Sequence, residues 1–164
     1  MACACAGVWA GQGSAVRFHL IDRVDAFEPS ESVRARKLTS LSEDYWEEDA
    51  DGLVMPPPFV LEALCQAATW LIMISTERAK RAALLSIGSV DWLGDVRPGE
   101  VLEMVGEIAS FGAETAVVSG HVSVDGRTVL EAQEIMCALI DADTLADLED
   151  TKRLQDMLTR AEAG

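Results

Sequence analysis

Apolar residues fill almost every position of one long segment in the middle of the chain. Three consecutive prolines, Pro56 to Pro58, lie at its start, and a proline at the first helical position can open a helix. The segment runs from Pro57 to Arg81, which is too long for a strand. Arg78 and Lys80 near its end suit the negative pole of a helix dipole. Since the segment is apolar on nearly every side, the sequence predicts one long, buried helix.

Shorter segments with strand-like patterns lie on both sides of this helix. Two precede it, joined by the turn-like cluster Glu-Pro-Ser-Glu, and four follow it in quick succession. Asp125-Gly126 is a strong signal for a two-residue hairpin between the last two. The predicted strands are residues 16–27, 32–41, 84–95, 100–110, 114–124 and 128–141. This pattern predicts an α+β fold in which an antiparallel sheet wraps around one long central helix.

The two ends of the chain differ from this middle part. Residues 1–15 lack a basic start and a continuous apolar core, so we interpret them as a loose leader and not as a signal peptide. Residues 16–141 are long enough to bury one core as a single domain. Residues 142–164 predict an appended C-terminal amphipathic helix. Its apolar stripe consists of Leu145, Leu148, Leu154, Met157 and Leu158.

The composition restricts the partners of the chain. Its net charge of -15 argues against nucleic acid and against an anionic membrane surface. The apolar run from Phe59 to Ile74 is short for a membrane span and is interrupted by polar residues. Cys3 and Cys5 have no second Cys/His pair after them, so we expect no metal site. Since the cysteines do not form a disulfide framework, we expect a reducing, cytoplasmic setting.

Two polar residues interrupt the apolar helix. Glu62 and Gln66 are four residues apart and therefore lie on the same helical face. Ionised carboxylates are seldom buried unless they are paired. Glu62 therefore either titrates as part of a site or holds a structural hydrogen bond, for example to Gln66. The neighbouring Phe59, Ala63 and Leu64 are core residues by default.

An acidic loop, residues 42–52, precedes the helix. Its Glu48 and Asp49 lie among further carboxylates, and such a charge run is usually a solvated surface. The alternative is that one of the two acts as a base, for which crowding of negative charge or desolvation would have to raise its pKa. His19 and His121 are the only histidines, and we interpret both as ordinary strand residues.

Short motifs in a fixed order carry a resemblance to a known family. They are Phe18-His-Leu-Ile-Asp-Arg-Val24, Glu28-Pro29, Met55-Pro56, Glu62-Ala-Leu-Cys-Gln66, Arg97-Pro-Gly99, Val124-Asp-Gly126, Glu131-Ala132 and Met136-Cys-Ala138. In this order and spacing they resemble the β-hydroxyacyl-acyl-carrier-protein dehydratases, the hot-dog-fold enzymes of fatty-acid and polyketide synthesis. The resemblance covers roughly residues 16–141 and implies a dimeric hot-dog fold.

The resemblance also implies a reaction. The family removes water from a 3-hydroxyacyl thioester that is held on the phosphopantetheine arm of an acyl carrier protein, and no cofactor is needed. A histidine takes the C2 proton, and a carboxylate on the central helix helps the hydroxyl to leave. A backbone N–H at the helix start stabilises the developing enolate oxygen. The histidine and this N–H come from one subunit, and the carboxylate comes from the other.

Only part of that site is present in this sequence. Glu62 occupies the carboxylate position, and Gln66 matches the glutamine one turn later. The family's loop reads His-Phe-Pro-Gly-x-Pro-x-Met-Pro-Gly. Its histidine falls on Asp49 when counted forward from the first motif and on Glu48 when counted back from the helix. Its last glycine falls on Pro57, which has no N–H to donate.

These differences predict a degenerate subunit. A homodimer would lack the base and the oxyanion donor in both sites. A heterodimer with a complete relative would have one live site, in which Glu62 meets the histidine of the other subunit. The alternative is a self-sufficient dehydratase or thioesterase that uses Asp49 or Glu48 together with Glu62.

By the same resemblance, the acyl chain runs alongside the central helix, and Tyr45 and Trp46 lie near the mouth of its tunnel. The substrate-binding residues are then Pro57, Phe59, Ala63, Leu64 and Gln66. Acyl carrier proteins are acidic, so a chain of the same sign repels them at long range. The carrier would dock either on a more basic partner subunit or on a local basic cluster. The cluster that we consider first is Arg78, Lys80 and Arg81, and the alternatives are Arg34, Arg36 and Lys37, or Arg97.

Overall fold

The computed structural model describes residues 18–142 and 148–160, which hold nine strands and two helices. The strands are β1 Arg23–Glu28, β2 Ser32–Leu38, β3 Glu47–Asp49, β4 Gly52–Val54, β5 Lys80–Ser86, β6 Ser89–Trp92, β7 Val101–Phe111, β8 Thr115–Val124 and β9 Arg127–Asp141. The helices are α1 Pro57–Ser75 and α2 Leu148–Thr159.

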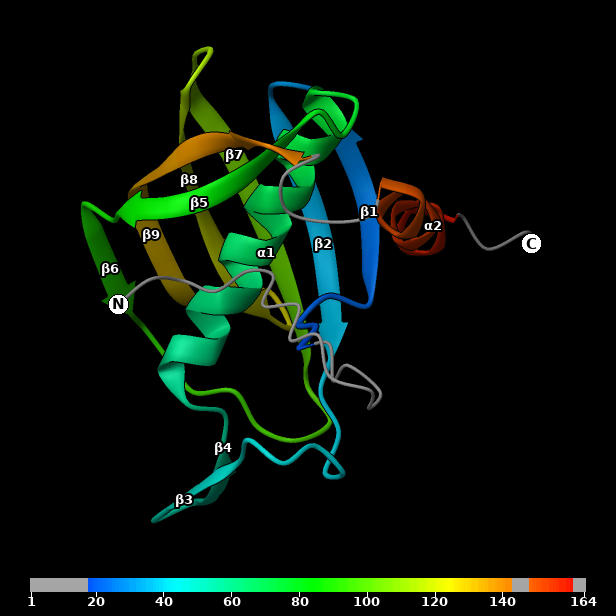
Figure 1. Cartoon of the computed structure of the whole chain (residues 1–164). Coiled ribbons are helices and arrows are strands. Elements are labelled where there is room, and N and C mark those ends of the chain that lie inside the picture. The colour runs from blue at the N-terminus through cyan, green and yellow to red at the C-terminus, as the bar shows by residue number, and fades with distance from the viewer. Residues whose placement is uncertain (1–17, 143–147, 161–164) are drawn as a thin grey trace, which may run out of the picture.

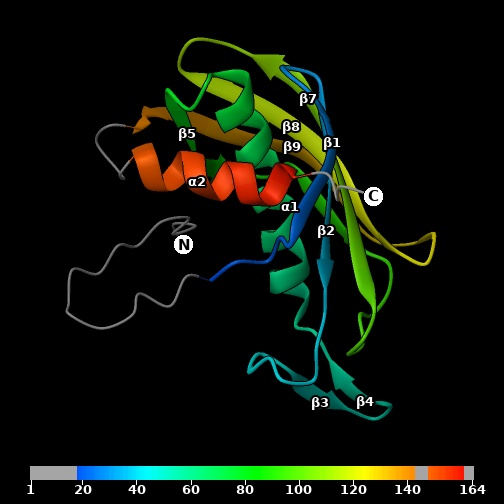
Figure 2. The same cartoon turned by 90° about the vertical axis from the view of Figure 1, so that its right-hand side faces the viewer.

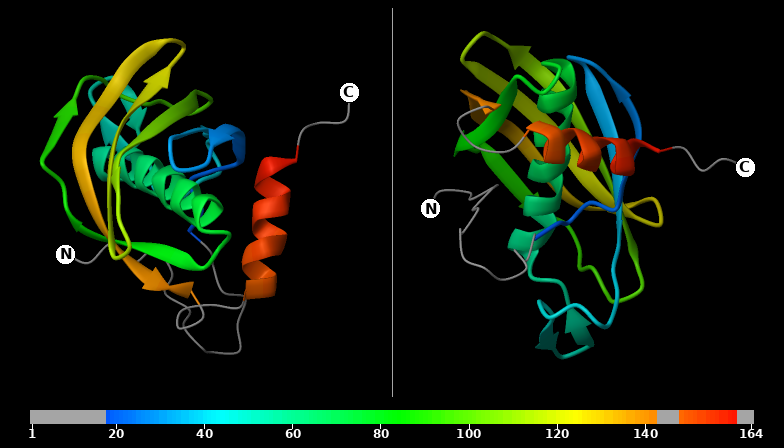
Figure 3. Two further views of the ribbon diagram at one scale, coloured as in Figure 1. Left: turned by 90° about the horizontal axis from the view of Figure 1, so that it is seen from above. Right: turned by 45° about the vertical axis from the view of Figure 1, so that its right-hand side comes forward.

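Seven of the strands form one antiparallel sheet that curls around α1 (Figure 1). The strand order is β1-β2-β7-β8-β9-β5, and β6 also pairs with β9. The view from above in Figure 3 shows α1 lying in the concave side of the sheet. The predicted architecture, one long helix wrapped by an antiparallel sheet, is confirmed. The predicted hairpin is confirmed as well, because Asp125 and Gly126 turn the chain between β8 and β9 with φ angles of 50° and 76°.

The core lies between α1 and the concave face of the sheet. Five α1 residues are completely shielded from solvent, namely Ala63, Leu64, Ala67, Leu71 and Ile72. A fully buried leucine or isoleucine stabilises a fold by about 2 kcal/mol relative to an exposed one. On β2, Val33 and Ala35 face the same core, and the next inward position holds Lys37, which is only 6% exposed.

α1 ends at Ser75, so the prediction that the helix continues to Arg81 is wrong. Glu77 and Arg78 have φ angles of 50° and 71°, and this left-handed backbone turns the chain out of the helix. The residues that follow form β5, which pairs with β9. The sequence did not mark this turn, because it contains neither glycine nor proline. Tertiary pairing with β9 outweighed the local helical pattern.

α2 lies against β1, the edge strand of the sheet (Figure 2). An uncovered edge strand exposes unpaired backbone groups, and a helix laid beside it protects that edge. Leu158 anchors α2 in the core, with only 5% of its surface exposed. α2 accounts for most of the predicted C-terminal helix. Residues 143–147 and 161–164 of that prediction lie outside the described residues.

β3 and β4 form a separate two-stranded hairpin that projects past the start of α1 (Figures 1 and 2). The sequence predicted only an acidic loop here. All three residues of β3 are exposed, so little apolar burial supports this hairpin. An isolated hairpin is at best marginally stable in water. The contacts at its base therefore determine where it lies.

Candidate functional site

The first turn of α1 is made of prolines. Pro56 caps the helix, and Pro57 and Pro58 occupy its first positions. The first N–H of this turn belongs to Phe59, and it donates to the carbonyl oxygen of Pro56 at 2.9 Å. Helix starts bind anions through free N–H groups. Pro57, at the family's oxyanion position, cannot supply such a donor.

Glu62 lies one turn further along α1 and is half-buried. Nε2 of Gln66 donates to Oε1 of Glu62 at 3.0 Å and to the carbonyl oxygen of Phe18 at 3.3 Å. Oε1 of Gln66 accepts the N–H of Leu20 at 2.9 Å. Because a backbone N–H can only donate, this contact fixes the orientation of the amide. Gln66 must therefore present its donor side to Glu62.

His19 lies between the two residues whose backbone binds Gln66. We interpreted it as a strand residue, but β1 begins at Arg23, so His19 belongs to the segment before that strand. Its side chain is exposed. The amide of Gln66 contacts the backbone on both sides of His19 and also contacts Glu62. Local sequence patterns do not indicate this proximity, because the contacts with Gln66 join residues 46 and 48 positions apart.

His121 lies on β8, as predicted, and on the face of the sheet opposite α1. Its strand neighbours are Val105 and Glu131. Together with Glu107 and others it lines a shallow cavity of about 220 Å³. This position separates His121 from the helix that carries Glu62.

A row of aromatic rings leads from the face of Glu62 to the acidic loop. The ring centroids of Phe18 and Phe59 are 5.3 Å apart, and those of Phe59 and Tyr45 are 5.5 Å apart. Trp46 continues the row, 5.1 Å from Tyr45. Each such contact contributes about 1 kcal/mol beyond simple burial. The row brings the loop to the start of α1, where the resemblance expects the mouth of a tunnel.

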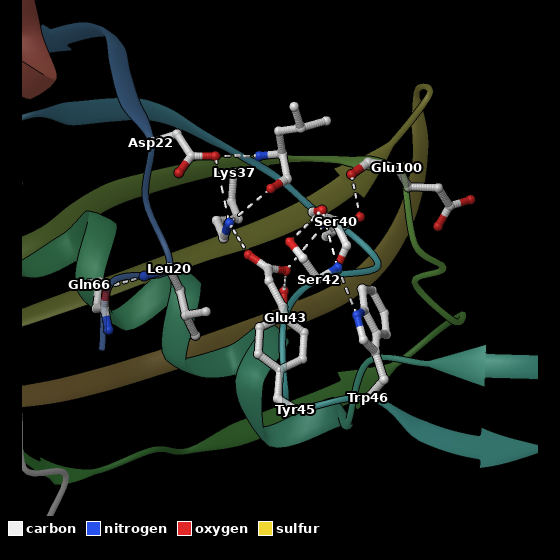
Figure 4. A network of polar contacts seen from close by, with 12 residues as sticks. Leu20, Asp22, Lys37, Ser40, Ser42, Glu43, Tyr45, Trp46, Gln66 and Glu100 are labelled. Carbon is white, nitrogen blue, oxygen red and sulfur yellow. Dashed lines mark hydrogen bonds and ion pairs between the residues drawn. The ribbon is translucent and has the colours of Figure 1, made fainter. Parts of the chain in front are cut away.

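A polar network holds this loop in place (Figure 4). Nζ of the buried Lys37 lies 2.5 Å from Oε1 of Glu43. The hydroxyl of Tyr45 donates to the other oxygen of Glu43, and Nε1 of Trp46 donates to the carbonyl oxygen of Ser40 at 2.8 Å. Buried charges persist in folded proteins when they are paired and hydrogen-bonded. The network therefore explains how β2 tolerates a lysine at an inward position.

Two pKa values shift within this network. Partial burial by itself would raise the pKa of Glu43, but the hydrogen bonds from Lys37 and Tyr45 outweigh it and hold that pKa below its ordinary value. Burial, followed by the hydrogen bond to Glu43, raises the pKa of Tyr45 well above its ordinary value. Tyr45 therefore stays protonated at neutral pH and acts as a donor.

Glu48 and Asp49 are neighbours on β3. Nη1 and Nη2 of Arg97 donate to the two carboxylate oxygens of Asp49, both at 2.9 Å. These bonds lower the pKa of Asp49, whereas a base at this position would need a raised pKa. The sequence could not show that Arg97, 48 residues later, faces Asp49.

The predicted substrate-binding residues fall into two groups. Pro57 is exposed, and Phe59 and Gln66 are half-buried on α1, so all three are accessible. Ala63 and Leu64 are completely buried in the core. The two described cavities, of about 220 and 500 Å³, are lined by other residues. The assignment of these residues to an acyl tunnel therefore stays a prediction.

The predicted docking cations are all engaged within the fold. Arg78 lies on the turn after α1, whereas Lys80 and Arg81 lie on β5. Their partners are Gln155 at 3.2 Å, Asp141 at 2.6 Å and Thr151 at 2.6 Å, respectively. Two of these three bonds tie α2 to the body of the fold. Carrier docking on this cluster stays a prediction, and it would compete with these contacts.

Among residues 18–142 and 148–160, no group of three or more His, Cys, Asp or Glu side chains is arranged to hold a metal ion. Cys3 and Cys5 lie outside the described residues. Within the same part of the chain, α1 is the one helix long and apolar enough to cross a membrane, but 56% of its most apolar stretch is buried inside the fold. A buried core helix can have the same length and apolar composition as a membrane span.

An antiparallel sheet around a central helix that carries one carboxylate defines this chain as a hot-dog protein. Its sequence matches the FabA-like domain over residues 14–133. The chain belongs to this family. α2 lies beyond the matched residues.

Similar relatives are 3-hydroxyacyl-[acyl-carrier-protein] dehydratases named FabZ. The protein from Pediococcus pentosaceus is 33% identical over 115 residues, which cover 69% of this chain and 77% of the relative. The protein from an Anaeromyxobacter species is 34% identical over 129 residues, which cover 76% of this chain and 82% of the relative.

Similar solved structures share the fold at low sequence identity. A Streptococcus mutans protein bound to acetyl-CoA has a TM-score of 0.60 and 18% identity, covering 80% of this chain and 98% of its own. A hypothetical thioesterase of Streptococcus pneumoniae with coenzyme A has a TM-score of 0.56 and 19% identity, covering 73% and 86%. These structures support the hot-dog fold and nothing more specific.

Proposed function

We propose that this chain takes part in the dehydration of 3-hydroxyacyl thioesters carried on an acyl carrier protein, in fatty-acid or polyketide chain building. In this proposal it contributes Glu62 to a site that a histidine-bearing relative completes. The isolated chain, as a homodimer, is inactive or weak. The named relatives, which are 3-hydroxyacyl-[acyl-carrier-protein] dehydratases, support the reaction class.

The chemistry needs an acid, a base and an oxyanion donor. The base removes the proton from C2, the electron pair forms the C2=C3 double bond, and the C3 hydroxyl leaves as water with a proton from the acid. The donor stabilises the thioester oxygen while C2 is losing its proton. Glu62, with one oxygen held by Gln66, is suited to the role of the acid. No cofactor is required, since the substrate brings its own phosphopantetheine arm.

One observation carries the proposal that the site is shared. In this proposal Glu62 on α1 is the acid half of the site, whereas the base half is altered at both of its positions. Pro57 has no N–H. Asp49 is bound to Arg97 with a lowered pKa, which makes it a poor base at neutral pH. A second subunit would have to supply both missing functions.

The test compares the purified chain with the chain co-expressed with a FabZ-type relative, using a 3-hydroxyacyl carrier substrate. To isolate the shared site, the relative carries a substitution in its own helix carboxylate. We expect turnover only in the complex, and Glu62→Gln should lower it about 100-fold or more. Glu77→Gln, at an exposed position just after α1, is the matched control and should leave it unchanged. Strong turnover by the isolated chain would contradict the shared site.

A second candidate is a self-sufficient dehydratase or thioesterase in which Glu62 works with a base of the same chain. Glu48 and Asp49 are two candidates for this base. One observation favours a third candidate, His19. Gln66 binds the backbone of Phe18 and Leu20, on both sides of His19, and it also binds Glu62. An imidazole titrates near neutral pH, which suits a general base.

Substitutions in the isolated chain separate the two candidates. If the chain turns over either a 3-hydroxyacyl or an acyl thioester alone, then His19→Ala, Glu48→Gln and Asp49→Asn identify its base. A loss of about 100-fold is expected for the residue that acts. His121→Ala, on the far face of the sheet, is the control for a histidine that takes no part.

A further inference from the structure

One arginine joins the β3–β4 hairpin to the body of the fold. Arg97 lies on the segment between β6 and β7, and its guanidinium reaches the hairpin at two places. It binds the carboxylate of Asp49, and its Nη1 donates to the carbonyl oxygen of Leu53 at 3.2 Å. Next to it, the N–H of Met55 donates to the carbonyl oxygen of Val96 at 2.9 Å. Since β3 is wholly exposed, these polar contacts position the hairpin.

Both carboxylate oxygens of Asp49 are occupied. Each accepts one nitrogen of the Arg97 fork at 2.9 Å, and Oδ1 also accepts the N–H of Asp51 at 2.8 Å across the turn of the hairpin. A two-pronged pair of this kind fixes geometry better than a single contact does. Arg97 also binds Asp95 at 3.0 Å, a carboxylate that lies outside the hairpin.

Glu48 precedes Asp49 on β3, so its side chain points to the other face of the hairpin. It is exposed, and its strand partner on β4 is Leu53. Within the described residues, no hydrogen bond or ion pair ties its carboxylate to the fold. Of the two residues that fall on the family's histidine position, only Asp49 is bound to Arg97.

We infer that Arg97 is a positioning residue. It anchors the hairpin through Asp49 and leaves Glu48 as the carboxylate that the hairpin presents where the family carries its base. Asp49 is then a structural residue. It falls on the position of the family's histidine in the sequence, but it has no catalytic role. The statement about the place of the family's base rests on the proposed function, whereas the anchoring does not.

Hydrogen exchange of the full chain tests the anchoring. Arg97→Gln and Asp49→Asn should each raise exchange of the amides of residues 47–54 about 3- to 10-fold, while exchange in α1 stays unchanged. The double variant should exceed neither single variant, because both changes remove the same pair. Asp95→Asn removes another carboxylate from the same guanidinium and should leave the hairpin within about twofold. Unchanged hairpin exchange in both single variants, or additive effects in the double variant, would overturn the inference.

Carbodiimide-driven amidation of carboxylates, mapped by mass spectrometry, tests the assignment of Glu48. In the parent chain Glu48 should react about fivefold faster than Asp49, whose oxygens are occupied. In Arg97→Gln the two should react alike. Equal reactivity in the parent chain would refute the assignment. Neither measurement requires turnover, so a failed dehydration assay and a failure of this inference are distinguishable.

Discussion

At the scale of single residues, two polar side chains occupy places where the pattern calls for apolar ones. Glu62 stood out in the sequence, because a helix apolar on nearly every side makes one carboxylate conspicuous. Lys37 did not stand out, because β2 also carries two exposed arginines. In the sequence alone, the lysine resembles one more exposed cation. In the fold Lys37 is only 6% exposed, and Glu43 reaches it from the loop. Partners supplied by another segment decide whether such a charge is tolerated.

The pair of Lys37 and Glu43 predicts acid sensitivity. The folded pKa of Glu43 lies below 4.5, so its contribution to stability is present above that value and is lost as pH falls through the folded pKa. Glu43→Gln resembles the protonated state. It should lower the free energy of unfolding by about 1 kcal/mol at pH 7, and this loss should shrink as the pH falls through the folded pKa of Glu43. Urea unfolding at pH 7 and at lower pH values measures this.

Glu114→Gln, at an exposed position in the turn between β7 and β8, is the matched control and should show no such trend. An effect of Glu43→Gln that does not shrink at any pH down to the acid unfolding transition would rule out the charged pair as its cause.

At the scale of elements, close packing of β8 against β7 and α1 depends on one glycine. Gly120 of β8 pairs with Gly106 of β7, and an added Cβ at Gly120 would lie 2.3 Å from the carbonyl oxygen of Val105 and 3.0 Å from Cδ1 of Leu64. The missing side chain leaves room for the backbone of β7 and for Leu64 of α1. The sequence offered no means to identify this position, because two distant segments create the contact.

Gly120→Ala should therefore destabilise the fold by about 3 kcal/mol, since the nearest atom belongs to the backbone and cannot move cheaply. Chemical denaturation gives the value. Gly112→Ala is the matched control, because its Cβ would meet nothing nearer than 3.4 Å, and it should change stability by less than about 1 kcal/mol. Equal effects of the two substitutions would refute the packing argument.

The docking of α2 predicts a contrast between adjacent residues. The sequence placed Met157 and Leu158 on one apolar stripe, but Leu158 is 5% exposed and Met157 is 59% exposed. Leu158→Ala should cost about 2 kcal/mol, whereas Met157→Ala should cost less than about 0.5 kcal/mol. Thermal unfolding of the two variants compares them. A larger loss for Met157→Ala would mean that its exposed face is buried by something beyond this single chain.

At the scale of the whole molecule, net charge affects how the chain would bind an acidic carrier. The net charge of -15 repels such a partner at long range. The cations that we first considered for docking are bound to Gln155, Asp141 and Thr151 within the fold. Docking of a carrier, on this chain or on a more basic partner subunit, stays a prediction.

Salt dependence tests this. Binding of an acyl carrier protein to the isolated chain should not weaken between 50 and 300 mM salt, because salt screens repulsion as well as attraction. Binding to a complex with a basic relative should weaken several-fold. Calorimetry on both samples provides the comparison. Strong low-salt binding by the isolated chain would instead point to a local basic site on its surface.

The sequence alone determined the class of fold and half of the candidate site. A long apolar helix with a single carboxylate, flanked by strands of period two, leaves few ways to bury that helix other than wrapping a sheet around it. The Asp-Gly turn and Glu62 follow from local chemistry in the same way. Proline at the helix start likewise excludes an N–H donor whatever the fold.

Tertiary structure alone decided which groups meet. The end of α1, the hairpin formed by the acidic loop, the pairing of Asp49 with Arg97 and the position of His19 beside Gln66 all depend on contacts between distant segments. Periodicity reports which face of an element is buried, but it carries no information about which side chain of another element lies opposite. For that reason the sequence left Asp49 and Glu48 as equal candidates for the position of the family's histidine. Only the fold showed that Asp49 is bound to Arg97 and that Glu48 is not.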